Sequence, residues 1–136
     1  MRPSAEPAFI DSSAFYALLD RDDANHKMAQ TLFEKAVLAK RPLLTSNFVV
    51  AETHALTLHR LGRDAAAAWL KAIPAHVIRA TTDDERQAQQ IIDQYADKDF
   101  SYCDVVSFAI MERLAVKSAI VFDRHFVQYG QFVVLS

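Results

Sequence analysis

The chain has 136 residues, which is the length of one domain rather than two, so we expect residues 1–136 to form a single domain. Hydrophobic residues make up 51% of the chain, which is enough to fill a core and excludes a disordered protein. The formal net charge is −2, whereas a nonspecific nucleic-acid binder is usually basic, so contact with nucleic acid would need a local basic patch or bound cations. The single cysteine, Cys103, excludes an internal disulfide framework and a cysteine-rich zinc site, and it suits a reducing cytoplasm.

The first half of the chain alternates short apolar runs with longer stretches in which apolar residues recur at helical spacing. Helix ends are marked by the Arg41-Pro42 pair and by Gly62. In chain order we expect a strand at Phe9-Ile10 that ends at Asp11, helices over Ser12–Leu19 and His26–Leu38, a strand at Leu43–Thr45, and a helix that begins at Ser46 or Asn47 and runs to Leu61.

The second half continues this alternation, with Pro74 as a helix end and Thr82-x-x-Glu85 as a helix start of the capping-box type. Strands separated by helices predict an α/β fold, a three-layer α/β/α sandwich with a mostly parallel central sheet. Ligands of such sheets bind beyond the carboxyl ends of the strands. Here we expect helices over Asp64–Ile73, Glu85–Ala96 and Tyr102–Leu114, and strands over His76–Ala80, Ala119–Phe122 (ending at Asp123) and Phe132–Leu135.

Two acidic residues end apolar strands, Asp11 after the first predicted strand and Asp123 after the strand near the C-terminus. Both should lie at the carboxyl edge of the sheet. Each of them alone is equally compatible with a simple structural role, in which the carboxylate begins a turn or caps the next helix.

Glu52 lies on an otherwise apolar helical face that it shares with Val49 and Leu56. An unpaired carboxylate on such a face costs several kcal/mol of desolvation, so a cation should lie nearby. One possibility is a salt bridge to Arg60 or Arg113, and the other is a metal ion.

Asp104 belongs to a second capping box, Ser101-x-x-Asp104, where an acid suits the helix dipole. It also shares a helical face with Phe108 and Met111, the side that should pack inward. A cap and a metal ligand are compatible roles, because both place the carboxylate at a helix start near the sheet edge.

Four carboxylates at one edge of a sheet would raise each other's pKa values, and a divalent cation is the simplest compensation. Ligation by oxygen without histidine or cysteine clusters favours Mg²⁺ or Mn²⁺ over zinc. The five histidines show no metal-binding spacing, and we expect them to be ordinary.

Four segments carry a family resemblance, in the right order and over nearly the whole chain: FIDSSAFYALLDRDDANHKMA, LLTSNFVVAETHAL, DFSYCDVVSFAIMERLA and IVFDRHFVQYG. They resemble PIN-domain nucleases, and they are most similar to the VapC-type toxins of bacterial and archaeal toxin–antitoxin pairs. The resemblance implies an α/β/α sandwich, in agreement with the elements expected above, and it implies hydrolysis of RNA with Mg²⁺ or Mn²⁺.

The resemblance also implies the site. The acids of the family fall on Asp11, Glu52, Asp104 and Asp123, which would be catalytic and would hold the metal. The small polar residues that match beside them would hydrogen-bond the carboxylates or the phosphate, and they are Ser13, Asn47 and Ser107.

Basic residues must bind the RNA backbone, and the candidates are Arg21, Arg113 and Arg124, the last of which directly follows Asp123. Asp99 could join the acids, but a position in an exposed loop is the favoured interpretation. Cys103 is expected to be a small buried thiol, with no role that we can assign.

The expected protein is therefore a metal-dependent endoribonuclease, the toxin of a type II pair, working as a homodimer with a cognate antitoxin. A housekeeping RNA-processing nuclease and an inactive PIN-like module that binds a protein partner remain alternatives. We expect a cytoplasmic protein without a membrane span, because there is no apolar run of about 18 residues and the acidic N-terminal segment does not resemble a signal peptide.

Overall fold

A computed structural model describes residues 5–135 of the chain. At its centre is a five-stranded sheet with the strand order β3-β2-β1-β4-β5, and every neighbouring pair of strands is parallel. The parallel sheet confirms the predicted fold class. The strands are β1 (Ala8–Ile10), β2 (Leu43–Ser46), β3 (His76–Ile78), β4 (Ser118–Ile120) and β5 (Val133–Val134).

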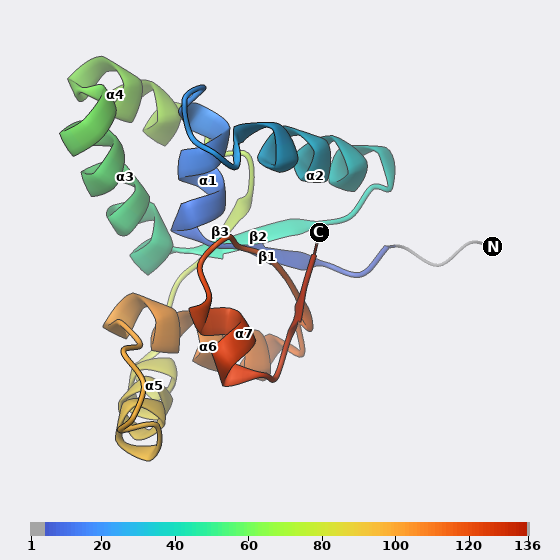
Figure 1. Ribbon diagram of the computed structural model, residues 1–136. Helices are drawn as coiled ribbons and strands as arrows, with labels where there is room; N and C mark the ends of the chain where they lie inside the picture. The colour runs from blue at the N-terminus through green and yellow to red at the C-terminus, as the bar shows by residue number, and fades with distance from the viewer. Residues whose placement is uncertain (1–4, 136) are drawn as a thin grey trace.

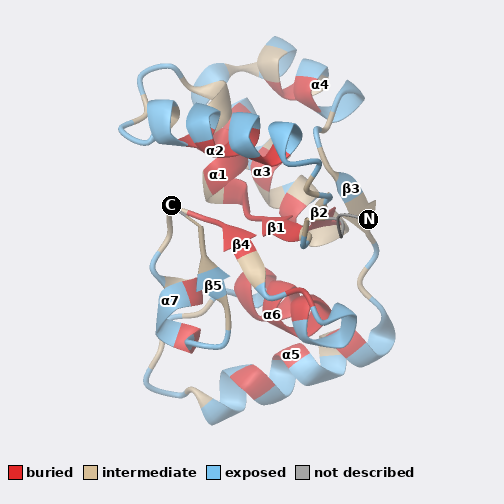
Figure 2. Cartoon of the chain, turned by 90° about the vertical axis from the view of Figure 1, so that its right-hand side faces the viewer, coloured by how far each residue is buried: buried red, intermediate tan, exposed pale blue. Residues whose placement is uncertain are grey.

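The helices form one layer on each face of the sheet, and both views show the two layers (Figures 1 and 2). Together with the sheet they make the predicted three-layer α/β/α sandwich. None of the helices within residues 5–135 is long and apolar enough to cross a membrane. One layer contains α1 (Ser12–Leu19), α2 (His26–Leu38), α3 (Asn47–Leu61) and α4 (Arg63–Lys71), and the other contains α5 (Thr82–Gln94), α6 (Tyr102–Leu114) and α7 (His125–Tyr129).

The core lies where β1 and β4 meet the two helical layers. Because helices cover both faces of the sheet, all of β1 is buried, as parallel strands require. On the far side of the sheet α6 is buried along most of its length, from Cys103 to Met111, whereas α2 and α5 show exposed outer faces (Figure 2). The central helix α6 is therefore held firmly against the sheet at the point where its N-terminus meets the strand ends.

The strand order reverses beside β1. The chain runs from β1 outward through β2 to β3 and then returns to form β4 on the other side of β1. Open parallel sheets bind ligands at such a switch point, in the crevice beyond the carboxyl ends of the two strands. Asp11 follows β1 directly, and Asp123 follows β4 after two further residues.

The helix after β3 begins three residues earlier than predicted. It starts at Thr82, and its capping box joins Thr81 to Asp84 instead of Thr82 to Glu85. The two pairs have the same spacing, so the sequence motif alone does not choose between them. Burial decides, because the earlier register places Asp84 inside the interface with α6 while Glu85 stays partly exposed.

The short helix α7 was not predicted, and β4 ends at Ile120 instead of Phe122. A helix of five residues is too short to show a periodic apolar pattern. Its signals are local ones: the Asp123 side chain accepts a hydrogen bond from the His125 N–H, and Gly130 ends the helix in a left-handed conformation. Asp123 is therefore a turn residue that precedes a helix.

Candidate active site

Asp11 is positioned by β1 on one side and by α1 on the other. Its backbone N–H donates to the Ile120 carbonyl at 3.1 Å, which ties it to β4. Its Oδ2 caps α1 by accepting hydrogen bonds from the Ser13 N–H at 3.2 Å and the Ser13 hydroxyl at 2.9 Å. The same hydroxyl oxygen accepts from the Phe122 N–H at 3.0 Å. Ser13 thus joins the Asp11 carboxylate to the segment that leads to Asp123.

Glu52 lies on α3 and faces the start of α1, where the Ser12 hydroxyl donates a hydrogen bond to its Oε1. Neither arginine considered as its partner fills that role. The Arg60 guanidinium lies 5.2 Å from the centre of the Tyr16 ring, and Arg113 pairs with Asp84. Among the described residues, the Glu52 carboxylate therefore has no ion pair with a lysine or arginine.

Asp104 occupies the predicted capping box at the start of α6. Its Oδ2 accepts a hydrogen bond from the Ser101 N–H at 3.0 Å, and the Ser101 hydroxyl accepts from the Asp104 N–H at 3.1 Å. The residue is only 4% exposed. Its Oδ2 also lies 2.6 Å from Nδ1 of His125.

His125 is the site residue that sequence reasoning missed, because the histidines were expected to be ordinary. Its Nδ1 lies between two acids, 2.6 Å from Asp104 Oδ2 and 3.3 Å from Asp123 Oδ1. Its backbone N–H also donates to Asp123 Oδ1, at 2.6 Å. The one signal in the sequence is its place two residues after a strand-ending acid, where a tight turn brings the ring back to that acid.

The carboxylate of Asp11 is buried near two other acids. Its Oδ1 is buried and has no hydrogen-bond partner among the described residues. Burial raises the pKa of Asp11 to about 7, the hydrogen bonds from Ser13 oppose the rise, and the charges of Asp104 and Glu52 add to it. Within residues 5–135 no lysine or arginine forms an ion pair with any of the four acids.

Cys103 lies in the same crowded environment. It is buried, as expected, and burial raises the pKa of its thiol well above the ordinary range. The charges of Glu52, Asp11 and Asp104 raise it further, and so does a hydrogen bond to Glu52. The thiol is therefore a neutral neighbour of the acids and not a nucleophile.

The arrangement fits a divalent cation. Among residues 5–135, no positive or hydrogen-bond-donating group binds the buried Asp11 Oδ1. Ligand atoms of Asp104, Asp123 and His125 all lie within 4.8 Å of one another, and this group does not include Asp11 or Glu52. Carboxylate oxygens with few competing cations are the donor set that Mg²⁺ and Mn²⁺ prefer. Two of the acids stand at the N-termini of α1 and α6, whose dipoles offset part of the repulsion.

Three of the other residues considered for the site are tied to partners other than the four acids. The Asn47 Oδ1 accepts from the Ala80 N–H at 2.9 Å, and the Ser107 hydroxyl donates to the Cys103 carbonyl at 2.9 Å. Arg113, a candidate for RNA contact, instead binds Asp84 with two hydrogen bonds of 2.8 and 2.9 Å, because Asp84 is buried and needs a cation.

Arg21, Arg124 and Asp99 are exposed, as we expected for the loop residue Asp99. Of the polar residues named from the resemblance, Ser13 alone has a hydrogen bond to one of the acids among those described. Arg21 and Arg124 stay candidates for contact with RNA.

The fold and the carboxylate cluster together define a class of protein. The sequence matches the family model of the PIN domain over residues 8–131, and the chain belongs to this family. The structural expectation drawn from the family resemblance is thereby confirmed.

Within the family, the chain is 33% identical over 127 residues to the 23S rRNA-specific endonuclease VapC20 of Mycobacterium tuberculosis, an alignment that spans 90% of this chain and 93% of the relative. The crystal structure of M. tuberculosis VapC20, described as a sarcin–ricin loop cleaving toxin, superposes with a TM-score of 0.81 at 31% identity and covers 91% of this chain and 95% of VapC20. The DNA-bound VapBC of Salmonella typhimurium has the same fold, with a TM-score of 0.70 at 12% identity over 96% of this chain and 98% of its own.

Proposed function

We propose that the protein is a metal-dependent endoribonuclease and the toxin of a type II toxin–antitoxin pair. The observation that carries the proposal is a buried Asp11 carboxylate oxygen that has no partner among the described residues, while the charges of Asp104 and Glu52 act on the same carboxylate. Such a cluster is costly unless a cation binds it. The likeness to VapC20 over nine-tenths of the chain supports RNA as the substrate.

The residues of the chain divide the work as follows. Asp11, Asp104 and Asp123 would hold a divalent ion, and Glu52 would hold a second ion or orient a water molecule. When bound, such an ion supplies a Lewis acid and lowers the pKa of its bound water. Ser13 fixes the Asp11 carboxylate by donating to its Oδ2, which leaves Oδ1 free to act as a ligand.

Binding of the RNA backbone falls to exposed cations. Arg124 directly follows Asp123 and is exposed, so it can bind a phosphate next to the scissile one. Arg21 is exposed in the loop between α1 and α2. Each phosphate contact adds to the salt dependence of RNA binding, whereas the acidic cluster repels RNA until cations bind.

Cleavage of purified ribosomal RNA tests the activity. We expect 23S rRNA to be cut in Mg²⁺ or Mn²⁺, with no cutting in EDTA, and the cutting to return when the ion is added back. The Asp11→Asn variant should lose at least about 100-fold in rate, because it removes one charge from the metal site. The matched control is Asp93→Asn, an exposed acid of α5, which should cut normally. Cutting at an equal rate in EDTA would contradict the proposal, and no cutting under any condition would favour an inactive binding module.

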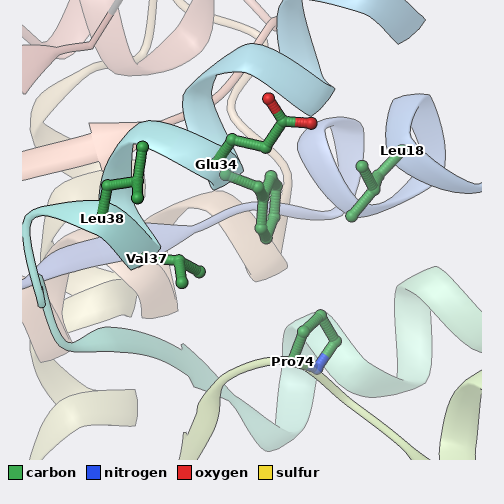
Figure 3. A pocket seen from close by; sticks show the side chains of 6 residues that line it. Leu18, Glu34, Val37, Leu38 and Pro74 are labelled. Carbon is green, nitrogen blue, oxygen red and sulfur yellow. The ribbon is translucent and has the colours of Figure 1, made fainter.

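The antitoxin partner is proposed to cover an apolar groove of about 560 Å³ between α1, α2 and the segment after α4. Leu18, Val37 and Pro74 surround it from three different segments, with Glu34 at its rim (Figure 3). Val37 and Leu38 are 69% and 83% exposed, which is costly for apolar side chains in a protein without a partner. A partner segment with apolar anchors fits the groove, and an arginine on that segment would suit the acidic cluster.

Growth of cells that express the protein tests the pairing. The protein alone should arrest growth, co-expression with its neighbouring gene product should restore it, and Asp11→Asn alone should not arrest it. Val37→Glu in the groove should weaken partner binding by about tenfold or more, and Ile92→Glu on α5 is the matched control. Normal growth with the active protein alone would count against a toxin and favour a housekeeping enzyme.

The homodimer and the cytoplasmic location stay proposals as well. A dimer should give twice the mass of the 15.3 kDa chain in light scattering. Fractionation of cells that express the protein at a low level should recover it in the cytoplasmic fraction.

A further inference from the structure

The Nδ1 atom of the His125 imidazole is aimed at the acidic cluster. Its side chain is 18% exposed, and its Nδ1 points into the space between Asp104 Oδ2 and Asp123 Oδ1, at 2.6 and 3.3 Å. These three residues are the described group whose ligand atoms come close enough to share one ion. They come from the start of α6, the loop after β4 and the start of α7.

The orientation of the ring is set by contacts on two sides. The backbone N–H of His125 donates to Asp123 Oδ1, which fixes the turn that carries the ring. On the other side the ring packs edge-on against Phe100, with centroids 5.6 Å apart and an interplanar angle of 74°. Phe100 itself packs against Phe108 of α6. The aromatic cluster therefore holds Nδ1 toward the carboxylates.

A nitrogen in this place can act as a hydrogen-bond donor to the two acids or as a ligand to an ion between them. The spacing agrees with a ligand, because neighbouring ligands of an octahedral ion with bonds of about 2.1 Å lie about 3 Å apart, between the 2.6 and 3.3 Å observed here.

We infer that His125 Nδ1 is a direct ligand of the divalent ion held by Asp104 and Asp123, and that this nitrogen makes the site prefer Mn²⁺ over Mg²⁺. The inference rests on the metal-dependent site of the proposed function. Its chemical reason is that Mg²⁺ binds oxygen ligands almost exclusively, whereas a transition-metal ion accepts an imidazole in its coordination shell. The family resemblance, which implies four acids as ligands, does not include this residue.

Electron paramagnetic resonance with Mn²⁺ alone as the probe tests the inference on the full chain without any cleavage assay. Titration of Mn²⁺ into the protein measures binding from the loss of the free-ion signal. Electron spin-echo modulation of the bound ion should then show coupling to ¹⁴N, and protein made with ¹⁵N-histidine should show the ¹⁵N pattern in its place. This isotope comparison needs no variant, so a folding defect cannot obscure it.

A variant then assigns the nitrogen to His125. His125→Gln keeps a polar group of similar reach, and it should bind Mn²⁺ about 10- to 100-fold more weakly and lose the histidine coupling. Its Mg²⁺ affinity, measured by competition with Mn²⁺, should change less than about threefold. The matched control is His59→Gln, an exposed histidine of α3, which should behave as the parent protein does.

The outcomes separate this inference from the proposed function. Bound Mn²⁺ without histidine coupling would overturn the ligand role of His125 and leave the metal-dependent nuclease standing. Tighter Mn²⁺ binding by His125→Gln would also overturn it, because His125 would then compete with the ion. No binding of Mn²⁺ or Mg²⁺ at millimolar concentration would overturn both.

Discussion

Asp11 combines a structural and a chemical role in one carboxylate. One oxygen caps α1 through Ser13, while the other is buried and has no hydrogen-bond partner in the part of the chain that the structure describes. The capping role agrees with the sequence pattern, in which an acid at a strand end also precedes a helix. The sequence pattern does not show that the second oxygen is buried. When such a carboxylate is ionised, its buried second oxygen needs a cation nearby, because a buried charge without a partner is costly.

The stability of the metal-free protein should therefore depend on pH through Asp11. Its pKa is raised from 3.8 to about 7, so between these values the folded state holds a proton that the unfolded chain has lost, and the free energy of unfolding falls as the pH rises through this window. At pH 8 in EDTA, Asp11→Asn should be more stable than the parent by about 1–3 kcal/mol, because asparagine also caps a helix.

Urea unfolding at pH 4 and pH 8 measures this effect. The difference between Asp11→Asn and the parent should nearly vanish at pH 4, where both side chains are neutral in the folded state. Asp93→Asn should show no such dependence on pH. An equal change in the free energy of unfolding at pH 4 and pH 8 would show that the effect of Asp11→Asn does not come from the raised pKa of Asp11.

Cys103 gives a second test at the residue scale. Burial, the charges of Glu52, Asp11 and Asp104, and a hydrogen bond to Glu52 all raise the pKa of its thiol. At pH 8 the folded protein should react with iodoacetamide about 100-fold more slowly than the urea-unfolded chain. The alkylation rate followed by mass spectrometry measures this, and a folded thiol that reacts as fast as the unfolded one would contradict the described environment.

An ion pair between the buried Asp84 and the partly exposed Arg113 joins α5 to α6. Burial by itself raises the pKa of Asp84, but the hydrogen bonds from Arg113 and Thr81 outweigh it and hold that pKa below the ordinary value. The carboxylate of Asp84 is 3% exposed and the arginine side chain 38% exposed. Asp84 thus serves both the cap of α5 and the packing of α5 on α6.

Arg113→Met should cost about 1–3 kcal/mol of the free energy of unfolding at pH 7, because it leaves Asp84 charged and buried without its cation. Because the pKa of Asp84 is lowered in the folded state, the ionised Asp84 stabilises the fold at pH values above the ordinary pKa of an aspartate. This stabilisation is lost as the pH falls and Asp84 takes up a proton, so the cost of Arg113→Met in free energy of unfolding should shrink in acid. Arg86→Met, which removes the exposed pair with Asp83, is the control and should have no measurable effect.

The end of α6 carries backbone strain. Ala115 has φ 55° and ψ 34°, the left-handed conformation that glycine adopts without a steric penalty. Ala115→Gly should stabilise the protein by about 0.5–1 kcal/mol. Ala39, which follows α2 at φ −80°, is the matched control, and Ala39→Gly should not stabilise. A loss of stability in Ala115→Gly, seen in thermal unfolding, would contradict the strain.

At the scale of the whole molecule, the topology assembles the site. The strand order reverses beside β1, where the segments that follow β1 and β4 carry Asp11 and Asp123 and the start of α6 carries Asp104. Glu52 joins from α3 through Ser12. Binding of an ion at this point would link both helical layers across the sheet edge.

Such an ion should stabilise the entire fold. At a concentration 100 times the dissociation constant, Mn²⁺ should raise the free energy of unfolding by about 2.7 kcal/mol. Asp123→Asn should lose most of this gain, since it removes one carboxylate without disturbing the core, whereas Asp93→Asn should keep it. An unfolding midpoint that is the same in Mn²⁺ and in EDTA would argue against a preformed metal site.

The sequence by itself determined the fold class and the order of nearly all elements, because helical and strand periodicity are local patterns. It also singled out the four acids, two of them from their place at strand ends. Their catalytic role stays a prediction that the experiments above address.

Only the tertiary structure decided which of two equivalent capping boxes starts α5, which acid Arg113 pairs with, and that His125 faces Asp104. These outcomes depend on burial and on contacts between residues 21 to 29 positions apart, and short-range periodicity carries no information about either.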